Sequence, residues 1–157
     1  MATKTYRTGS VGAMMDEYER ASEELIRLLE SISDEDYERV RDLETQDESC
    51  RSIQTIMTHV IGAGYGYAGM MRDSWGAPRA EPKREPAPRR DVPAKMRTML
   101  GYTVETLEGK WELSEEEQSA MRIQSRWGPV YDFEQLFEHA IVHVLRHRRQ
   151  IEKFLAK

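Results

Sequence analysis

The sequence lacks several features that would place a protein in a particular class. Its 157 residues include one cysteine, so no disulfide can form within the chain, and we expect a reducing, cytoplasmic location. No stretch approaches the roughly 20 apolar residues that a membrane-spanning helix needs. The N-terminus has no apolar run behind its basic residues, so no signal peptide is predicted. No segment alternates with a period of two over several β-branched residues, which argues against a sheet.

An excess of positive charge is also missing. The net charge is −5, whereas a general nucleic-acid binder shows a basic face. We therefore predict neither nucleic acid nor a membrane as a partner. Apolar residues make up 39% and charged residues 32%, which is typical of a globular protein. The length is natural for one domain, which we expect to span residues 1–157.

Apolar residues instead recur at intervals of three and four, which is the period of an amphipathic helix. The long segments with this period are residues 10–32, 49–75, 91–111 and 132–157. Four such helices predict an all-α fold, an antiparallel four-helix bundle. Short helices are predicted at Asp34–Val40 and from Ser114. Gly76–Arg90 contains four prolines and cannot be regular helix, so it is predicted to be one long crossover loop.

The four histidines form the most informative pattern in the chain. His139, His143 and His147 follow one another at intervals of four on the last predicted helix and fan across about 80° of it. Residues four apart lie about 6 Å from each other, so two imidazoles can converge on one ion. His59 on the second helix could supply a third ligand. The spacing alone does not decide between the pairs 139/143 and 143/147.

Two ligands from one helix and one from another would make a three-histidine metal site. Such a site leaves coordination positions open for water or substrate, which is the catalytic pattern. Imidazoles suit divalent zinc, nickel, iron, copper or manganese, and the sequence does not choose among them. A solvated, pH-sensitive histidine ladder is the alternative interpretation.

Residues near the histidines admit two interpretations each. Gly62 and Gly66 lie on the side of the helix that carries His59, where they would either leave room for a ligand or allow close helix packing. Tyr67 and Trp127 could line a pocket, although core and loop positions are favoured. Cys50 precedes the second helix and could be a nucleophile, but an ordinary small residue is the preferred interpretation.

Polar residues of the last helix are candidate partners of the site. Arg146 shares the histidine side and is the best candidate for binding an anion. Gln150 lies near His147 and could donate or accept the hydrogen bond that orients a ligand imidazole. Solvated side chains are expected at Arg148 and Arg149.

The same residues carry a resemblance to a known family. The segment His143-Val-Leu-Arg-His147-Arg-Arg-Gln150 resembles the last-helix signature of the DinB/YfiT-like superfamily, in which a His-x-x-x-His pair precedes an Arg-x-Gln-like tail. Met57-Thr-His59-Val60 resembles the second-helix element of that family, and Trp127-Gly128 also matches. The resemblance covers essentially the whole chain. One departure is Arg149, which stands where the family usually has glycine.

The resemblance implies a four-helix bundle, often dimeric, that holds a divalent metal ion. Carried over by position, the ligands would be His59, His143 and His147. His139, Arg146 and Gln150 would then support the ligands or contact substrate.

Members of this family include transferases that use bacillithiol, mycothiol or glutathione, as well as maleylpyruvate isomerases. We therefore expect a metal-dependent thiol S-transferase or hydrolase that acts on a small electrophile, with a low-molecular-weight thiol as a partner. A homodimer is expected. The alternatives are a non-enzymatic, stress-related binding module with a structural or sensory metal, and a metal-free helical interaction protein.

Overall fold

The computed structural model describes residues 3–157, and most of these are helical. The elements are α1 (Gly9–Glu30), α2 (Asp34–Glu38), the 3-10 turn η1 (Glu48–Cys50), α3 (Ile53–Ser74), the 3-10 turn η2 (Arg89–Asp91), α4 (Val92–Thr106), α5 (Glu115–Ala120), β1 (Ile123–Gln124), β2 (Val130–Tyr131) and α6 (Phe133–Leu155). The predicted all-α bundle is confirmed. Among the described residues, no helix combines the length and apolar character that a bilayer span requires.

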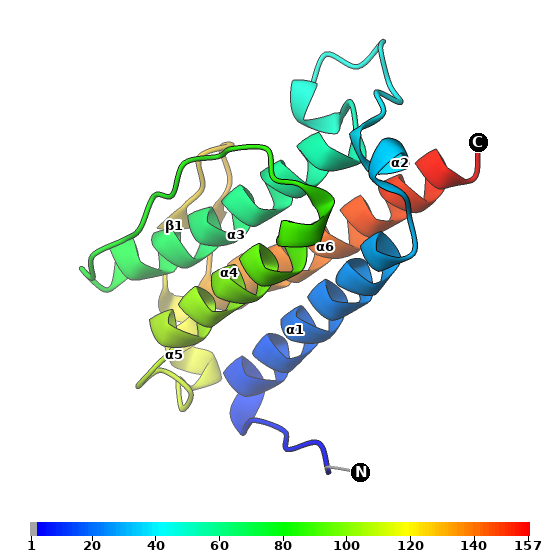
Figure 1. Ribbon diagram of the computed structural model, residues 1–157. Helices are drawn as coiled ribbons and strands as arrows, with labels where there is room; N and C mark the ends of the chain where they lie inside the picture. The colour runs from blue at the N-terminus through cyan, green and yellow to red at the C-terminus, as the bar shows by residue number, and fades with distance from the viewer. Residues whose placement is uncertain (1–2) are drawn as a thin grey trace.

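Four long helices form the bundle. Helix α1 packs against α4 and α6, and α3 packs against the same two helices, so α1 and α3 lie on a diagonal. Figure 1 shows α3 and α4 running in the same direction, with the chain between them returning along the outside of α3. Helices α1 and α6 also run in the same direction, whereas α1 is antiparallel to α4 and α3 is antiparallel to α6. This topology requires the one long crossover loop that the prolines predict.

The core contains the apolar stripes of all four helices. Its largest fully buried side chains include Tyr18, Phe133 and Phe137, which meet edge to face across α1 and α6. Aromatic edge-to-face contacts add to the free energy of burial. These contacts hold α6 against α1. Another side of α6 contacts α3.

Capping residues decide where the helices begin. Helix α3 begins at Ile53 and not at Ser49 as predicted, because Ser52 and Thr55 form a reciprocal capping box. The preceding residues form the separate turn η1, capped by Asp47. Asp132 caps α6 as predicted. Asp91 makes no side-chain cap bond, because it ends η2, and α4 stops at Thr106, before the predicted end at residue 111.

One feature of the backbone was not predicted. The strands β1 and β2 pair as an antiparallel hairpin of two residues each, too short to show an alternating pattern. Gly128 adopts a φ of +121° in the turn, a conformation that favours glycine. The hairpin holds Trp127 beside α6.

Two glycines of α3 make room for neighbouring segments of the chain. A Cβ on Gly64 would lie 2.3 Å from the sulfur of Met99 in α4, and a Cβ on Gly62 would lie 2.5 Å from Nε of Arg84 in the crossover loop. Neither residue lines the histidine cleft described below. The structure thus favours close packing, rather than room for a ligand beside His59, as the reason for Gly62 and Gly64, whereas a Cβ on Gly66 would meet no atom within 4 Å.

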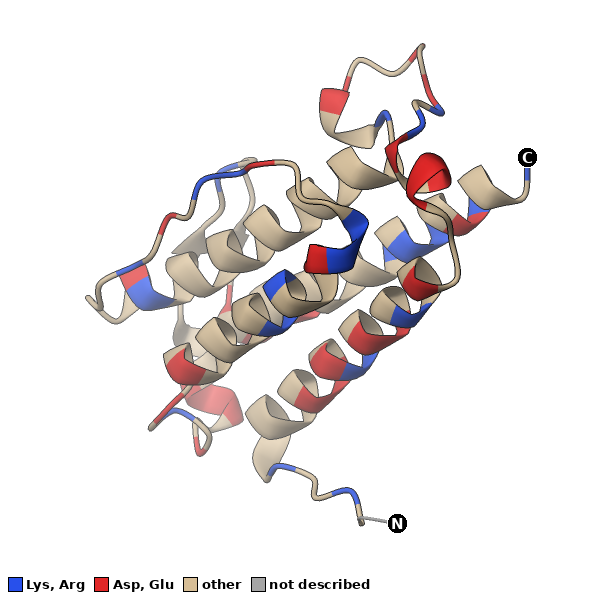
Figure 2. Cartoon of the chain, in the orientation of Figure 1, with Lys and Arg blue, Asp and Glu red and all other residues tan. Residues whose placement is uncertain are grey.

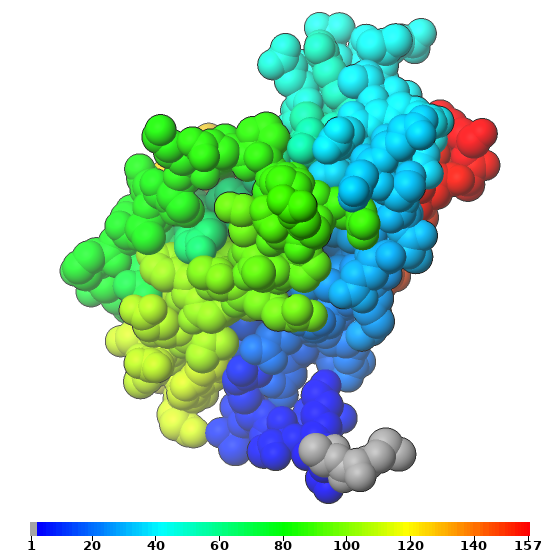
Figure 3. Space-filling view, viewed as in Figure 1, coloured from blue at the N-terminus to red at the C-terminus, as the bar shows by residue number. Residues whose placement is uncertain are grey.

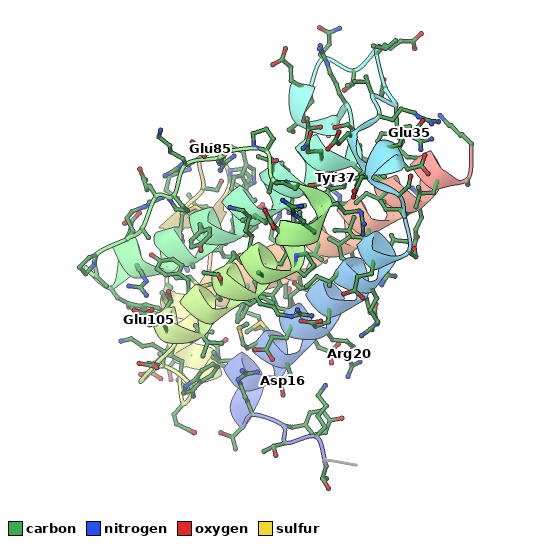
Figure 4. The ribbon with its side chains drawn as sticks, viewed as in Figure 1. Asp16, Arg20, Glu35, Tyr37, Glu85 and Glu105 are labelled. Carbon is green, nitrogen blue, oxygen red and sulfur yellow. The ribbon has the colours of Figure 1, made fainter. Side chains whose placement is uncertain are left out.

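Both ends of the crossover loop are attached to the bundle. Near its beginning, the backbone N–H of Ala80 donates a hydrogen bond to the hydroxyl of Tyr102 over 2.8 Å. Near its end, the carbonyl of Ala87 accepts a hydrogen bond from the buried hydroxyl of Tyr37 over 3.0 Å. Figure 4 shows Tyr37 between α2 and this end of the loop. The loop is therefore fixed across α3 at two points.

Candidate metal centre

Three histidines converge where α3 and α6 lie side by side. Nε2 of His143 is 2.9 Å from Nε2 of His59 and 3.2 Å from Nε2 of His147. One ligand atom from each residue lies within 4.8 Å of both others. Two imidazole nitrogens on one tetrahedral zinc ion, each about 2.0–2.1 Å from it, are about 3.3 Å apart. The spacing of the three nitrogens is therefore suited to a single metal ion.

Burial keeps these imidazoles neutral. It is the largest cause that lowers the pKa of all three, and in His143 burial, together with the neighbouring His147 and His59, lowers the pKa to about 3. A metal ion binds the neutral imidazole and competes with the proton for it. At neutral pH the three side chains are consequently in the form that can bind metal.

Gln150 determines which nitrogen of His147 faces the other histidines. Its Oε1 atom lies 2.9 Å from Nδ1 of His147 and can only accept, so Nδ1–H donates this hydrogen bond. Nε2 of His147 then presents a lone pair toward His143. Nε2 of His143 has only one hydrogen or one lone pair for two neighbouring nitrogens, whereas one cation can accept a lone pair from all three nitrogens. The donor set thus fits a cation.

His139 lies outside this group. Its ring stacks on Trp127 with the centroids 4.9 Å apart and the planes 24° from parallel, and Tyr67 meets it edge-on at 5.6 Å. Its centroid is 6.4 Å from that of His143. The described residues that could hold a metal ion are His59, His143 and His147, without His139. Stacking on Trp127 of the hairpin holds His139 away from the other histidines. Of the two pairs that the spacing left open, the geometry therefore favours 143/147 over 139/143.

A cleft of about 580 Å³ opens over the histidines, a volume within the usual range for small-molecule sites. The residues that line it are Asp47, Cys50, His59, Tyr67, Trp127, His139, His143, Arg146, His147, Arg149 and Gln150. The three predicted ligands and the three residues predicted to support them, His139, Arg146 and Gln150, all line this cleft. Tyr67 and Trp127, for which core and loop positions were favoured, line it as well.

Positive charge lies at the rim. Arg146 is exposed and has no acidic partner within 4.0 Å among residues 3–157. Its charge lowers the pKa of all three histidines of α6, which places it close to them. Arg148 was expected to be solvated, but it pairs with Glu24 of α1. Arg149 is exposed, as expected, and lines the cleft.

The turn η1 adds two residues to the cleft wall, of which Asp47 was not singled out in the sequence. The turn η1 brings Cys50 and its neighbour Asp47 to the cleft, and Sγ of Cys50 lies 3.5 Å from a carboxylate oxygen of Asp47. Hydrogen bonds from Ser49 lower the pKa of Asp47, so this carboxylate is ionised. A carboxylate partner is the opposite of the cationic surroundings of reactive cysteines, which agrees with an ordinary role for Cys50.

Comparison with known proteins agrees with this geometry. A sequence model of the DinB family matches residues 1–156. The chain is similar in fold to a protein whose structure is titled "Crystal structure of the mycothiol-dependent maleylpyruvate isomerase", with a TM-score of 0.58 and 15% identity. The match covers 88% of this chain but 59% of that protein, so the chain spans less than two thirds of its length. No curated protein matches the sequence significantly.

Proposed function

This chain belongs to the DinB family, and we propose that it holds a divalent metal ion through His59, His143 and His147 and acts on a small molecule there. The observation that carries the proposal is the convergence of three neutral imidazole nitrogens at 2.9 and 3.2 Å. The reaction we propose is the transfer of a low-molecular-weight thiol to a small electrophile. Hydrolysis of the electrophile is the other form of this reaction.

The metal would supply Lewis acidity and would lower the pKa of a thiol or water ligand. The protein supplies orientation. Gln150 holds His147 in the tautomer whose Nε2 faces the site. Burial raises the pKa of Tyr67, so its hydroxyl stays protonated and can donate a hydrogen bond to a substrate oxygen in the cleft.

The rim suggests which substrates fit. Arg146 has no acidic partner in the described chain and can bind a carboxylate or another anion. The stacked rings of Trp127 and His139 form an adjacent flat surface. We therefore propose a small anionic electrophile with an apolar body. The name of the mycothiol-dependent structural neighbour supports a thiol as the second substrate.

A structural or sensory metal is the second candidate function. Three protein ligands leave positions open, and a cleft leads to them, so these features favour catalysis over a closed structural site. Cytoplasmic location remains a prediction. A homodimer also remains a prediction, and the exposed Val142 and Leu145 of α6 would suit it. Sedimentation equilibrium that gives a single species of about 18.3 kDa at micromolar concentration would contradict the dimer.

The test begins with elemental analysis of protein purified without a metal-binding tag. We expect close to one equivalent of divalent metal in the wild type and in His139→Ala, and little in His143→Ala. Metal-loaded protein is then assayed with bacillithiol, mycothiol or glutathione and a chlorinated electrophile. Metal-dependent loss of free thiol supports the transferase. If metal binds but no thiol or hydrolytic substrate is consumed, the structural or sensory role replaces it.

A further inference from the structure

A second cleft lies on another side of α3, between that helix, α4 and the crossover loop. Its volume is about 340 Å³, and it adjoins a pocket of about 260 Å³ under the same loop. In Figure 3 the residues of α3 are visible at the bottom of the hollow between the loop and α4. None of its lining residues lines the histidine cleft. We call it the loop cleft.

The loop that forms one wall of the loop cleft is attached to the bundle. The attachments of Ala80 to Tyr102 and of Ala87 to Tyr37 hold the loop on either side of it. The residues between these attachments cross α3 as an exposed strap, on which Glu85 is labelled in Figure 4. Binding there would not need a large rearrangement of the loop, which lowers the entropic cost of association.

The charge of the loop cleft is opposite to that of the whole chain. Its two parts are lined by five basic and two acidic residues, whereas the chain carries a net charge of −5. In Figure 2, basic (blue) and acidic (red) residues alternate along the loop. The basic residues are Arg79, Lys83, Arg84, Lys95 and Arg126, and the acidic residues are Glu81 and Glu85.

The two acids are already paired. Glu81 lies 3.1 Å from Arg79 and 3.3 Å from Arg126, and Glu85 lies 3.7 Å from Lys83. Arg84 and Lys95 have no acidic partner within 4.0 Å in the described part of the chain. Two cations at the cleft are therefore available to an external anion.

Gly62 sets the position of Arg84. The arginine side chain lies directly over this glycine, since Nε would be 2.5 Å and Cδ 2.9 Å from a Cβ placed there. Any other residue would push the side chain out of its position. Next to it, Ile61 and Tyr65 of α3 offer an apolar wall, and Tyr65 packs on Tyr102 with the ring centroids 5.2 Å apart. The cleft thus combines free positive charge with an apolar surface.

We propose that the loop cleft is a second binding site, which takes a small organic anion: a carboxylate or phosphate group on an aromatic or aliphatic body, with Arg84 and Lys95 contacting the anionic group. The apolar body lies against Ile61 and Tyr65. Bidentate arginine contacts suit both kinds of anion. The proposal does not rest on the reaction proposed at the metal centre, and the two clefts share no lining residue.

Nuclear magnetic resonance titration of the full chain with benzoate and with phenyl phosphate tests the proposal. We expect saturable shifts of the backbone amides of Thr58, Gly62 and Gly66, and no saturable shift with neutral benzyl alcohol. Arg84→Gln should weaken binding about tenfold, as expected for loss of a charge-assisted hydrogen bond. Arg90→Gln, an exposed change in the same loop and outside the cleft, should leave the affinity unchanged.

A second variant keeps the test independent of a direct loss of charge. Gly62→Ala favours the helix by propensity but displaces Arg84, so it should weaken anion binding while the protein remains folded. The proposal is overturned if neither anion gives saturable shifts, or if Arg84→Gln binds as tightly as the wild type. It is also overturned if saturable shifts are confined to Asp47 and Cys50 and are lost in Arg146→Gln, because the anion would then occupy the histidine cleft alone.

Discussion

The hydrogen bond between Gln150 and His147 makes a quantitative prediction about metal affinity. Gln150→Leu keeps the approximate volume but removes the acceptor that lies 2.9 Å from Nδ1 of His147. The imidazole would then lose its preferred tautomer and orientation. Loss of such a partner typically costs 10- to 100-fold in metal affinity, or about 1.4–2.7 kcal/mol. Gln150→Glu, which offers a charged acceptor, should bind metal at least as tightly as the wild type.

The measurement is competition with a chromophoric chelator for Zn²⁺ at pH 7.5. Lys153→Leu, an exposed substitution by the same residue one turn along α6, is the control and should not change the affinity. The reasoning is wrong if Gln150→Leu binds Zn²⁺ as tightly as the wild type. It is also wrong if Lys153→Leu weakens binding to the same extent, because the effect would then belong to the helix and not to the hydrogen bond.

Three further predictions concern the same centre. Alanine substitution of His59, His143 or His147 should abolish stoichiometric metal binding, whereas His139→Ala should retain it; elemental analysis showing the reverse for His139 and His147 would move the site one turn earlier. A chelator should lower the melting temperature and added metal should restore it, because ligand at 1,000 times its Kd stabilises the native state by about 4 kcal/mol; an unchanged melting temperature would indicate that no metal binds. In metal-free protein, burial lowers the pKa of His143 to about 3, so the unfolded chain, with an ordinary histidine pKa near 6.5, binds the proton more tightly. The free energy of unfolding should therefore decrease as the pH falls below about 6.5, by at most about 1.4 kcal/mol per pH unit for this residue, and His143→Gln should reduce that slope in urea titrations. An equal slope in the variant would show that His143 is not the group that titrates.

Much of the fold follows from local patterns in the sequence. Apolar residues at intervals of three and four place the four long helices, and the prolines of the crossover loop place the one long connection. Helix boundaries depend on which polar side chain makes the capping bond. At the start of α3, both Ser49 and Ser52 are good caps, and only the pairing of Ser52 with Thr55 decides between them. Asp91 fails as a cap because the chain enters α4 through another turn.

The composition of the site was less predictable than its centre. His59, His143 and His147 could be named because helical spacing and the resemblance to DinB-like sequences select them together. The position of Asp47 and Cys50 at the cleft could not be predicted, because it depends on how the turn η1 folds back. The signal available was the pattern Asp47-x-Ser49, in which an aspartate accepts hydrogen bonds two residues on.

The angular position of the small residues around α3 explains why the sequence left two interpretations of Gly62 open. Gly62 lies only about 60° around α3 from His59, so a projection of one helix places both on one side. The neighbours on the two edges of that side differ: α6 faces His59, whereas the crossover loop covers Gly62. One helix thus serves two clefts, with a histidine at the edge of one and a glycine under Arg84 at the edge of the other. A single-helix projection cannot distinguish these edges, because the distinction is made by the segments that pack on them.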